Sequence, residues 1–154
     1  MPCNDVTEVL RLILDKEDRV IEYGLHKKTC GGSVGDPSLL GFWARGRLST
    51  EIMDASPEDF LQKYPTDDII QEFLRLKHFF ALQNGLKVLF GLESGSLQAS
   101  CIVDKIVYTS EGIEFTAQVK VRVLTRQIKA CGSCMSCGTK NILLARKLQS
   151  SSLL

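Results

Sequence analysis

Residues 113–123 show the strictest alternation of apolar and polar side chains in the chain, and this pattern limits the possible folds most. Successive side chains of a β-strand point to opposite faces, so a period of two predicts a strand with one buried and one exposed face. Such a strand needs helices or a second sheet to cover its apolar face. The apolar positions are Ile113, Phe115, Ala117, Val119, Val121 and Val123.

Other segments predict partners for this strand. Residues 101–108 form a second apolar run, and residues 109–112 between the two runs predict a hairpin turn. Near the amino terminus, residues 7–14 fit either a helix or a strand, because apolar residues recur at both spacings. Residues 21–26 alternate clearly, and the short charged turn at 15–18 favours another hairpin there.

Several helix starts are predicted between the two hairpins. The pairs at 36–37 and 56–57 each combine a capping Asp or Ser with proline at the first helical position, where the missing N–H costs little. Ser49 is predicted to cap a short helix that extends through Met53, and the polar residues 66–68 open the longest one.

Together these elements predict an α+β fold, in which helices cover one face of a small antiparallel sheet. A carboxy-terminal β-hairpin and a cysteine-rich loop follow, and the hairpin either lengthens the sheet or forms a small lobe. Residues 91–95 begin and end with glycine and read as a linker. We therefore expect two units, residues 1–91 and residues 96–147.

The size and composition of the chain favour a cytoplasmic protein with reduced thiols. Its 154 residues, 44% of them hydrophobic, suffice for a compact core. No apolar stretch approaches the ~20 residues that a membrane span needs, and the first residues lack the pattern of a signal peptide. In a reducing compartment, the six cysteines are expected to be ligands or nucleophiles rather than disulfides.

The charges are unevenly distributed, although the net charge is only +1. Residues 115–154 contain seven basic residues and no acidic one, whereas all 18 acidic residues precede them. Such a basic region either faces an acidic partner or nucleic acid, or covers the acidic half of the same protein. Because the basic residues lack interleaved aromatic residues, nucleic-acid binding is the least favoured of these interpretations.

Three cysteines, which we call the cysteine triplet, lie within seven residues: Cys131, Cys134 and Cys137. Two-residue spacing lets successive thiolates turn toward one ion or cluster, and the small residues between them permit a tight loop. Ferredoxin-type sequences share this spacing but add a fourth cysteine, and none follows here. We predict a metal or iron–sulfur site whose fourth ligand is one of the other cysteines (Cys3, Cys30 or Cys101), a histidine, a residue of another chain or an exogenous group.

A second set of potential ligands is dispersed along the chain. Cys3 and Asp5 precede the first predicted strand, and Cys30 follows the second. The outer ends of the two arms of a hairpin are neighbours, so Cys3 and Cys30 can lie close together. His78 stands beside two phenylalanines on the long predicted helix, where a histidine taken alone is more often packed than a ligand. His26 falls at an exposed strand position and is assigned no role.

Several of these residues lie in motifs that resemble the NifU/IscU family of iron–sulfur cluster assembly scaffolds. Residues 2–6, with the sequence Pro-Cys-Asn-Asp-Val, resemble the P-x-C-G-D-V opening of the family. Residues 20–31 resemble the strand that leads to the second cysteine–glycine pair of the family, and residues 76–78 resemble its lysine-x-histidine stretch. The resemblance covers about residues 2–91 and implies a NifU/IscU-like fold there.

The resemblance implies that the protein assembles or carries an iron–sulfur cluster and is not an enzyme. In such scaffolds, three cysteines and an aspartate hold a nascent [2Fe–2S] cluster near a histidine. By position, Cys3, Asp5 and Cys30 match the ligands and His78 matches the histidine. Phe79 stands where the family has its third cysteine. The proline-rich chaperone-docking segment and the amino-terminal helix of the family have no counterpart here.

The implied partners are a cysteine desulfurase, which delivers persulfide sulfur, and apo iron–sulfur proteins, which receive the cluster. Whether a homodimer completes the site stays open. The bound group would be iron or a [2Fe–2S] cluster, with zinc as the alternative, because a thiolate-rich site suits either. Two other functions also stay open: a zinc-stabilised interaction module, and a SufE-like sulfur acceptor that carries persulfide on one cysteine.

The cysteine triplet either supplies the ligand that Phe79 replaces or holds a separate cluster. In the first case, replacing all three cysteines with serine abolishes cluster binding at Cys3 and Cys30 as well, because the site loses a ligand. Iron and sulfide analysis of the triple variant after anaerobic purification measures this. Undiminished cluster binding in the triple variant rejects the shared site.

Overall fold

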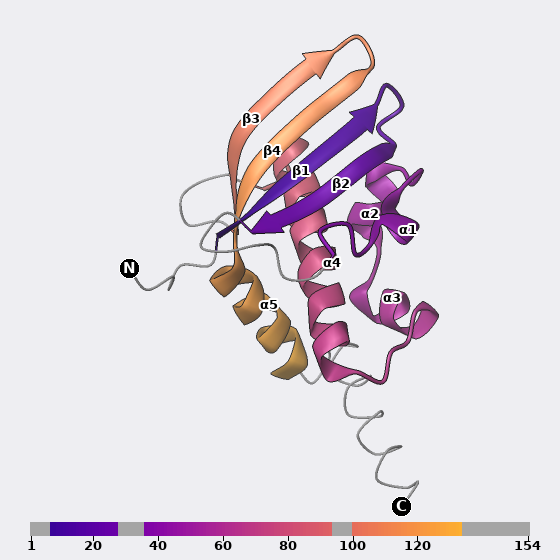
Figure 1. Cartoon of the computed structure of the whole chain (residues 1–154), viewed down its shortest axis with the longest axis vertical. Helices are drawn as coiled ribbons and strands as arrows, with labels where there is room; N and C mark the ends of the chain where they lie inside the picture. Colours follow the sequence, from indigo (N-terminus) through magenta and orange to yellow (C-terminus); the bar gives the residue numbers. More distant parts are fainter. Residues whose placement is uncertain (1–6, 28–35, 94–99, 134–154) are drawn as a thin grey trace, which may run out of the picture.

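The sheet of this protein combines two strands from the first part of the chain with two strands from its later part. The computed structural model describes residues 7–27, 36–93 and 100–133, and within them it has an α+β fold (Figure 1). The strands are β1 (Thr7–Asp15), β2 (Val20–Lys27), β3 (Cys101–Thr109) and β4 (Gly112–Lys120). The helices are α1 (Gly41–Ala44), α2 (Ser49–Asp54), α3 (Pro57–Lys63), α4 (Ile69–Leu89) and α5 (Val121–Ser133).

The four strands form one antiparallel sheet in the order β2-β1-β4-β3. β1 pairs on one side with β2 and on the other with β4, so that Leu12 lies between Tyr23 and Phe115. The segment for which the sequence allowed both helix and strand is therefore a strand, because both of its edges find a partner. The hairpin of β3 and β4 lengthens the sheet rather than forming a separate lobe. The division into residues 1–91 and 96–147 stays a prediction, and the sheet contains strands from both units.

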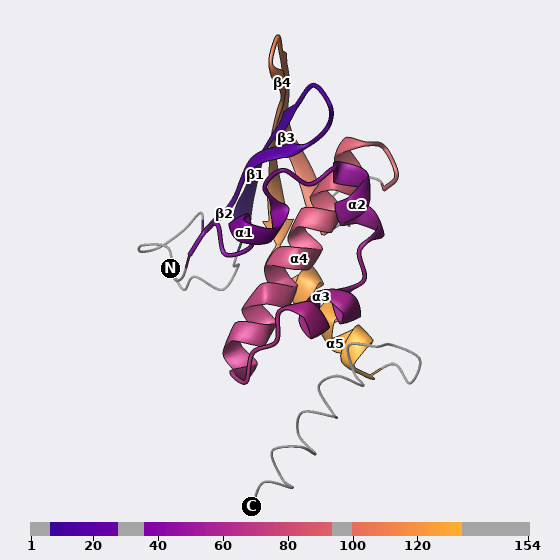
Figure 2. The same cartoon turned by 90° about the vertical axis from the view of Figure 1, so that its right-hand side faces the viewer.

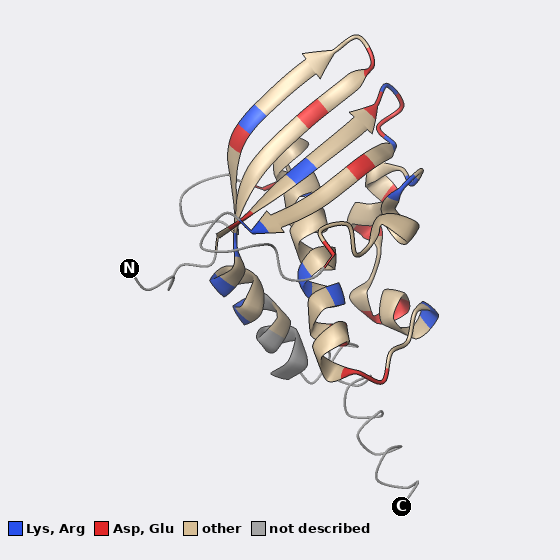
Figure 3. Cartoon of the chain, in the orientation of Figure 1, with Lys and Arg blue, Asp and Glu red and all other residues tan. Residues whose placement is uncertain are grey.

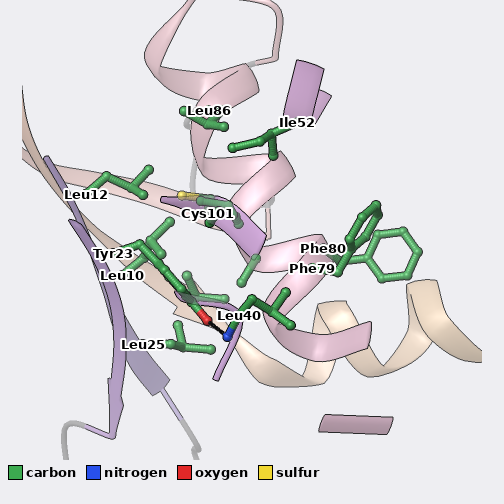
Figure 4. Packing of buried hydrophobic residues seen from close by; sticks show 14 of the residues in the cluster. Leu10, Leu12, Tyr23, Leu25, Leu40, Ile52, Phe79, Phe80, Leu86 and Cys101 are labelled. Carbon is green, nitrogen blue, oxygen red and sulfur yellow. Dashed lines mark hydrogen bonds between the residues drawn. The ribbon is translucent and has the colours of Figure 1, made fainter. Parts of the chain in front are cut away.

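Helices cover one face of this sheet, as predicted (Figure 2). The inward side chains of β1 and β4 are buried beneath α4, and Figure 4 shows part of this core. The opposite face carries charged positions (Figure 3), where Arg11 lies 3.6 Å from Glu22 and 3.8 Å from Glu114. These three side chains are about half exposed, so the ion pairs contribute little stability.

Most predicted helix starts are found, with two differences. Ser49 does not cap α2 but is its first residue, and its hydroxyl donates to the carbonyl of Asp18. Ser56 caps α3 and Asp68 caps α4, because each side chain accepts a backbone hydrogen bond from the first helical turn. The first predicted helix begins later than expected, at Gly41. The carbonyl of Pro37 instead accepts a hydrogen bond from the N–H of Leu25 on β2, so the chain before α1 is tied to the sheet.

The strand predicted to reach Val123 ends at Lys120, and α5 begins with the next residue. Alternation was misleading here because the same stretch also fits a helical period, with Val121, Leu124 and Ile128 spaced three and four residues apart. Leu124 and Ile128 are buried where α5 packs against α4. Contact with α4 therefore decides in favour of the helix, which local sequence could not do.

A glycine in α4 sets how closely this helix approaches the sheet. Gly85 lies against Leu10 and Phe115, and a Cβ atom at this position would collide with the Leu10 side chain. Glycine inside a helix costs about 1 kcal/mol relative to alanine. The close packing of α4 on the buried face of the sheet offsets this cost.

Gly85→Val is expected to destabilise the protein by about 2 kcal/mol, because overpacking a closed core typically costs ~1–3 kcal/mol. Urea unfolding followed by circular dichroism measures the change. Gly41→Ala is the control, since the nearest atoms to a Cβ there lie at 3.7 Å, an ordinary contact distance. Equal unfolding midpoints for the two variants would show that Gly85 does not set the approach of α4.

Candidate functional site

The strand ends that lead to the predicted ligands lie together at one edge of the sheet, where β1 begins and β2 ends. β1 begins at Thr7, which pairs with Lys120 at the end of β4. The next residue, Glu8, pairs with Lys27 at the end of β2 (Figure 1). We call this region, defined by Thr7, Glu8, Lys27 and Lys120, the Thr7 end of the sheet.

Cys3, Asp5 and Cys30 lie outside the described residues, but the chain limits their distance from the Thr7 end. Cys3 is four residues before Thr7, and Cys30 is three residues after Lys27. An extended chain spans about 3.5 Å per residue, so the Cα atoms lie within about 14 Å and about 11 Å of these strand ends. The pairing of β1 with β2 therefore permits the two cysteines to meet.

A buried ion pair joins α4 to the Thr7 end. The ammonium of Lys77 lies 2.9 Å from Oε1 of Glu8, and the two side chains are only 13% and 10% exposed. Because His78 is the next residue on α4, the ion pair also holds the histidine backbone in this region. The ion pair thus connects α4 to the Thr7 end one residue before His78.

His78 is itself buried and contacts Tyr23. The residue is 6% exposed, and its Nδ1 lies 3.3 Å from the Tyr23 hydroxyl. That hydroxyl also accepts a hydrogen bond from the N–H of Leu40 (Figure 4). Burial, and to a lesser extent the Lys77 ammonium, lower the pKa of His78 to about 4. The imidazole is therefore neutral at pH 7, which is the form that binds metals.

The hydrogen bond with Tyr23 determines which nitrogen of His78 can bind a metal. Burial raises the pKa of Tyr23 above its ordinary value, so the phenol keeps its proton. If the Tyr23 hydroxyl donates to Nδ1, the imidazole proton is on Nε2. If Nδ1–H instead donates to the Tyr23 oxygen, Nε2 has a free lone pair. Binding of a metal at Nε2 requires the second arrangement.

Phe79, which the predicted resemblance aligns with a third cysteine, belongs to the core. It is fully buried, and its ring centroid lies 5.5 Å from that of Trp43 and 5.3 Å from that of Phe60. Successive residues of a helix are rotated by about 100°, so α4 directs position 79 toward α1 and α3 while His78 faces β2. Packing of these helices explains the residue found here, and Phe79 offers no ligand.

Cys101 was one of the candidates for the fourth ligand of the cysteine triplet. It is 1% exposed, and burial, with a smaller contribution from Glu93, raises the pKa of its thiol to about 12. Cys101 thus lies in the apolar core, with its thiol protonated at pH 7.

Within the cysteine triplet, only Cys131 falls in a described element, and it lies in the last turn of α5. The predicted cysteine-rich loop therefore begins inside a helix, and the remainder, with Cys134 and Cys137, lies outside the described residues. A helix rises about 1.5 Å per residue, so the Cα of Cys131 is about 15 Å from that of Val121. Across residues 7–27, 36–93 and 100–133, no three His, Cys, Asp or Glu side chains gather as a metal site.

Three residues of this region were not predicted from the sequence as part of a site. Tyr23 contacts His78, and Glu8 forms an ion pair with Lys77 at the Thr7 end. One signal could have identified Glu8. It occupies the inward-facing position of the alternating series Glu8, Leu10, Leu12 and Leu14, and a charged residue on an apolar face is normally paired or functional.

No protein-family model, curated protein or solved structure matches this chain. The resemblance to the NifU/IscU family therefore stays a prediction. Among the described helices, none is both long enough and apolar enough to cross a membrane.

The lowered pKa of His78 predicts a loss of stability in mild acid. The folded-state value of about 4 lies below the ordinary value of 6.5, so the unfolded chain takes up a proton first as the pH falls. Stability is therefore complete above pH 6.5 and decreases toward pH 4, by on the order of 3 kcal/mol. Urea unfolding at several pH values between 7 and 4.5 measures how the free energy of unfolding changes with pH. For His78→Gln this free energy should fall less steeply with decreasing pH, and an equal dependence on pH would show that His78 is not the residue responsible.

Proposed function

We propose that this protein binds iron or a [2Fe–2S] cluster through Cys3, Asp5 and Cys30, and serves as a scaffold or carrier in iron–sulfur cluster assembly. The observation that carries the proposal is the strand pairing at the Thr7 end of the sheet. It brings together the strand ends that lead to these three residues, and Lys77, the residue before the neutral His78, contacts Glu8 there. Thiolate, carboxylate and imidazole groups together suit iron and zinc.

The chemistry proposed for these residues is binding and release rather than turnover. Thiolates are the ligating form of cysteine, and a bound metal lowers the thiol pKa so that this form is available at neutral pH. The three proposed ligands lie before β1 and after β2 in the sequence. A carrier has to transfer its cluster to another protein, so the proposal requires a site from which the cluster can leave.

The proposed partners are a cysteine desulfurase and apo iron–sulfur proteins. Arg122 and Arg126 on α5 are exposed, and Figure 3 shows basic positions along this helix. Exposed arginines favour contact with an acidic partner over the alternative that this region covers the acidic half of the chain.

The cysteine triplet is proposed to form a second site. Cys131 lies about 15 Å along α5 from Val121, and α5 runs beside α4 away from the strand ends (Figure 1). This placement favours a separate site over replacement of the missing third cysteine. A ligand from a second copy of the chain is then the other source that could complete the site at Cys3 and Cys30.

Anaerobic purification, followed by a visible absorption spectrum and by iron, sulfide and zinc analysis, tests the function. We expect a coloured protein with about equal amounts of iron and sulfide, as a [2Fe–2S] cluster requires. Cys3→Ser and Cys30→Ser are expected to lose this cluster, because each removes one thiolate. Cys101→Ala is the matched control, since the Cys101 thiol is buried and protonated.

The other outcomes of the same experiment overturn the proposal. A colourless protein with stoichiometric zinc identifies a zinc-stabilised module. A sulfur adduct on Cys30 in the mass spectrum, without bound metal, identifies a sulfur acceptor. Equal metal content in Cys30→Ser and Cys101→Ala rejects the assigned ligands.

A further inference from the structure

A pocket of about 220 Å³ lies beside the connection from α2 to α3. Two buried aromatic residues, Trp43 and Phe60, contribute to its lining, and their ring centroids are 5.1 Å apart. Three exposed carboxylates, those of Glu51, Asp54 and Asp59, also line it. We call this region the Trp43 pocket. Because pockets for small molecules usually measure ~300–1,000 Å³, its volume suits a single side chain better than a cofactor.

The backbone behind the Trp43 pocket is held in place by α4. The side-chain amide of Gln83, which is buried, donates to the carbonyls of Ile52 and Ala55, at 2.9 and 2.7 Å. Ser56 then caps α3, because its hydroxyl accepts a hydrogen bond from the N–H of Asp59. Both α2 and α3 lie against α4 (Figure 2). A pocket built on such fixed elements loses little conformational entropy when it is filled.

The two basic residues of the pocket do not neutralise its carboxylates. Nε of Arg47 donates to the carbonyl of Trp43, and the guanidinium lies 5.2 Å from the centre of the Trp43 ring. The ammonium of Lys63 lies 5.9 Å from the centre of the Tyr64 ring. In the described part of the chain, no ion pair joins either cation to a carboxylate. The three carboxylates of the pocket therefore remain available to a cation from outside.

The chemistry of the pocket favours a guanidinium over a metal ion as this cation. Within the residues that the structure describes, no three acidic, cysteine or histidine side chains lie close enough together to hold a metal. A larger cation with several donors can reach carboxylates that are further apart. The guanidinium of arginine has five N–H donors in a planar fork, and it stacks readily on aromatic rings. An arginine side chain thus suits the carboxylates, the aromatic lining and the volume of the pocket.

An exposed aromatic residue adjoins the Trp43 pocket. Phe42 on α1 is 62% exposed, and its ring centroid lies 5.1 Å from that of Tyr64. Tyr64 in turn contacts the ring of Phe60 and the ammonium of Lys63, and both of these residues line the pocket. Large apolar side chains exposed beside a pocket often mark a protein-binding surface. A partner with an apolar residue next to its arginine gains a second contact here.

We propose that the Trp43 pocket binds an arginine side chain of a partner protein, and that an apolar side chain next to this arginine packs on Phe42 and Tyr64. Complementary charge carries the choice of a basic partner segment, since the lining holds three carboxylates and two cations. The surface is formed by residues between Gly41 and Tyr64, all of them described. The inference is independent of the proposed function, because none of the proposed cluster ligands takes part.

Titration with the end-blocked peptide Ser-Leu-Arg-Leu-Ser, followed by tryptophan fluorescence, tests the inference, because Trp43 is the only tryptophan of the chain. We expect a saturable change with a dissociation constant on the order of 0.5 mM, as for a small contact, and weaker binding at higher salt concentration. The same peptide with citrulline in place of arginine is the control, since citrulline keeps the shape and lacks the charge. It is expected to bind about tenfold more weakly.

The double variant Glu51→Gln with Asp54→Asn is expected to bind the arginine peptide about tenfold more weakly, because two of the three carboxylates lose their charge. Glu111→Gln with Asp104→Asn is the matched control. It removes the same two charges from exposed positions of the β3–β4 hairpin, and its affinity is expected to equal that of the unmodified protein. Since all four residues are exposed, both variants should keep the circular dichroism spectrum of the unmodified protein.

Phe42→Ser tests the second contact. It is expected to weaken binding of the leucine-flanked peptide by about threefold, and to leave binding of Ser-Gly-Arg-Gly-Ser unchanged, because only the first peptide has apolar residues beside the arginine. Unchanged binding of both peptides shows that the proposed apolar contact is wrong.

Three results overturn the arginine site itself. Equal affinities for the arginine and citrulline peptides show that no charge is recognised. Equal affinities of the two double variants place the peptide outside the Trp43 pocket. An unchanged Trp43 fluorescence up to about 5 mM peptide shows that the pocket does not bind arginine in this affinity range. None of these results bears on the metal content that tests the proposed function.

Discussion

The packing of α4 across the inner face of the sheet is the constraint on which the other features depend. The apolar side chains of β1 and β4 need a cover, and Gly85 allows α4 to approach Leu10 closely enough to provide it. Once α4 lies in this position, Lys77 meets Glu8, and His78 meets Tyr23. The arrangement of polar groups at the Thr7 end is therefore a consequence of core packing.

The same packing separates residues that the sequence places side by side. Lys77, His78 and Phe79 are consecutive, yet they contact β1, β2 and the aromatic core respectively. Helical rotation of about 100° per residue accounts for this division. It also explains why His78 contacts the sheet while Phe79, the next residue, packs among the aromatic side chains of the core.

The sequence predicted most of the described elements, because periodicity and helix caps are local properties. The strands 101–108 and 21–26 and the caps at Ser56 and Asp68 were recognisable in this way. The end of β4 was not, since the residues after Lys120 fit both a strand and a helix and only contact with α4 separates the two. For the site, His78 was predicted from the sequence, but its hydrogen-bond partner Tyr23 and the ion pair of Glu8 with Lys77 were not.

By itself, the sequence determined the α+β class and the single covered face of the sheet, because these follow from residue type and spacing. The ligands Cys3, Asp5 and Cys30, with His78 nearby, stay predictions that rest on the resemblance to the NifU/IscU family. The tertiary structure alone decided that β4 lies beside β1, that His78 is neutral, and that Oε2 of Glu8 is buried without a hydrogen-bond partner among the described residues. Each of these depends on contacts between residues far apart in the chain, and their burial and pairing energies are set only when the sheet and α4 have closed around them.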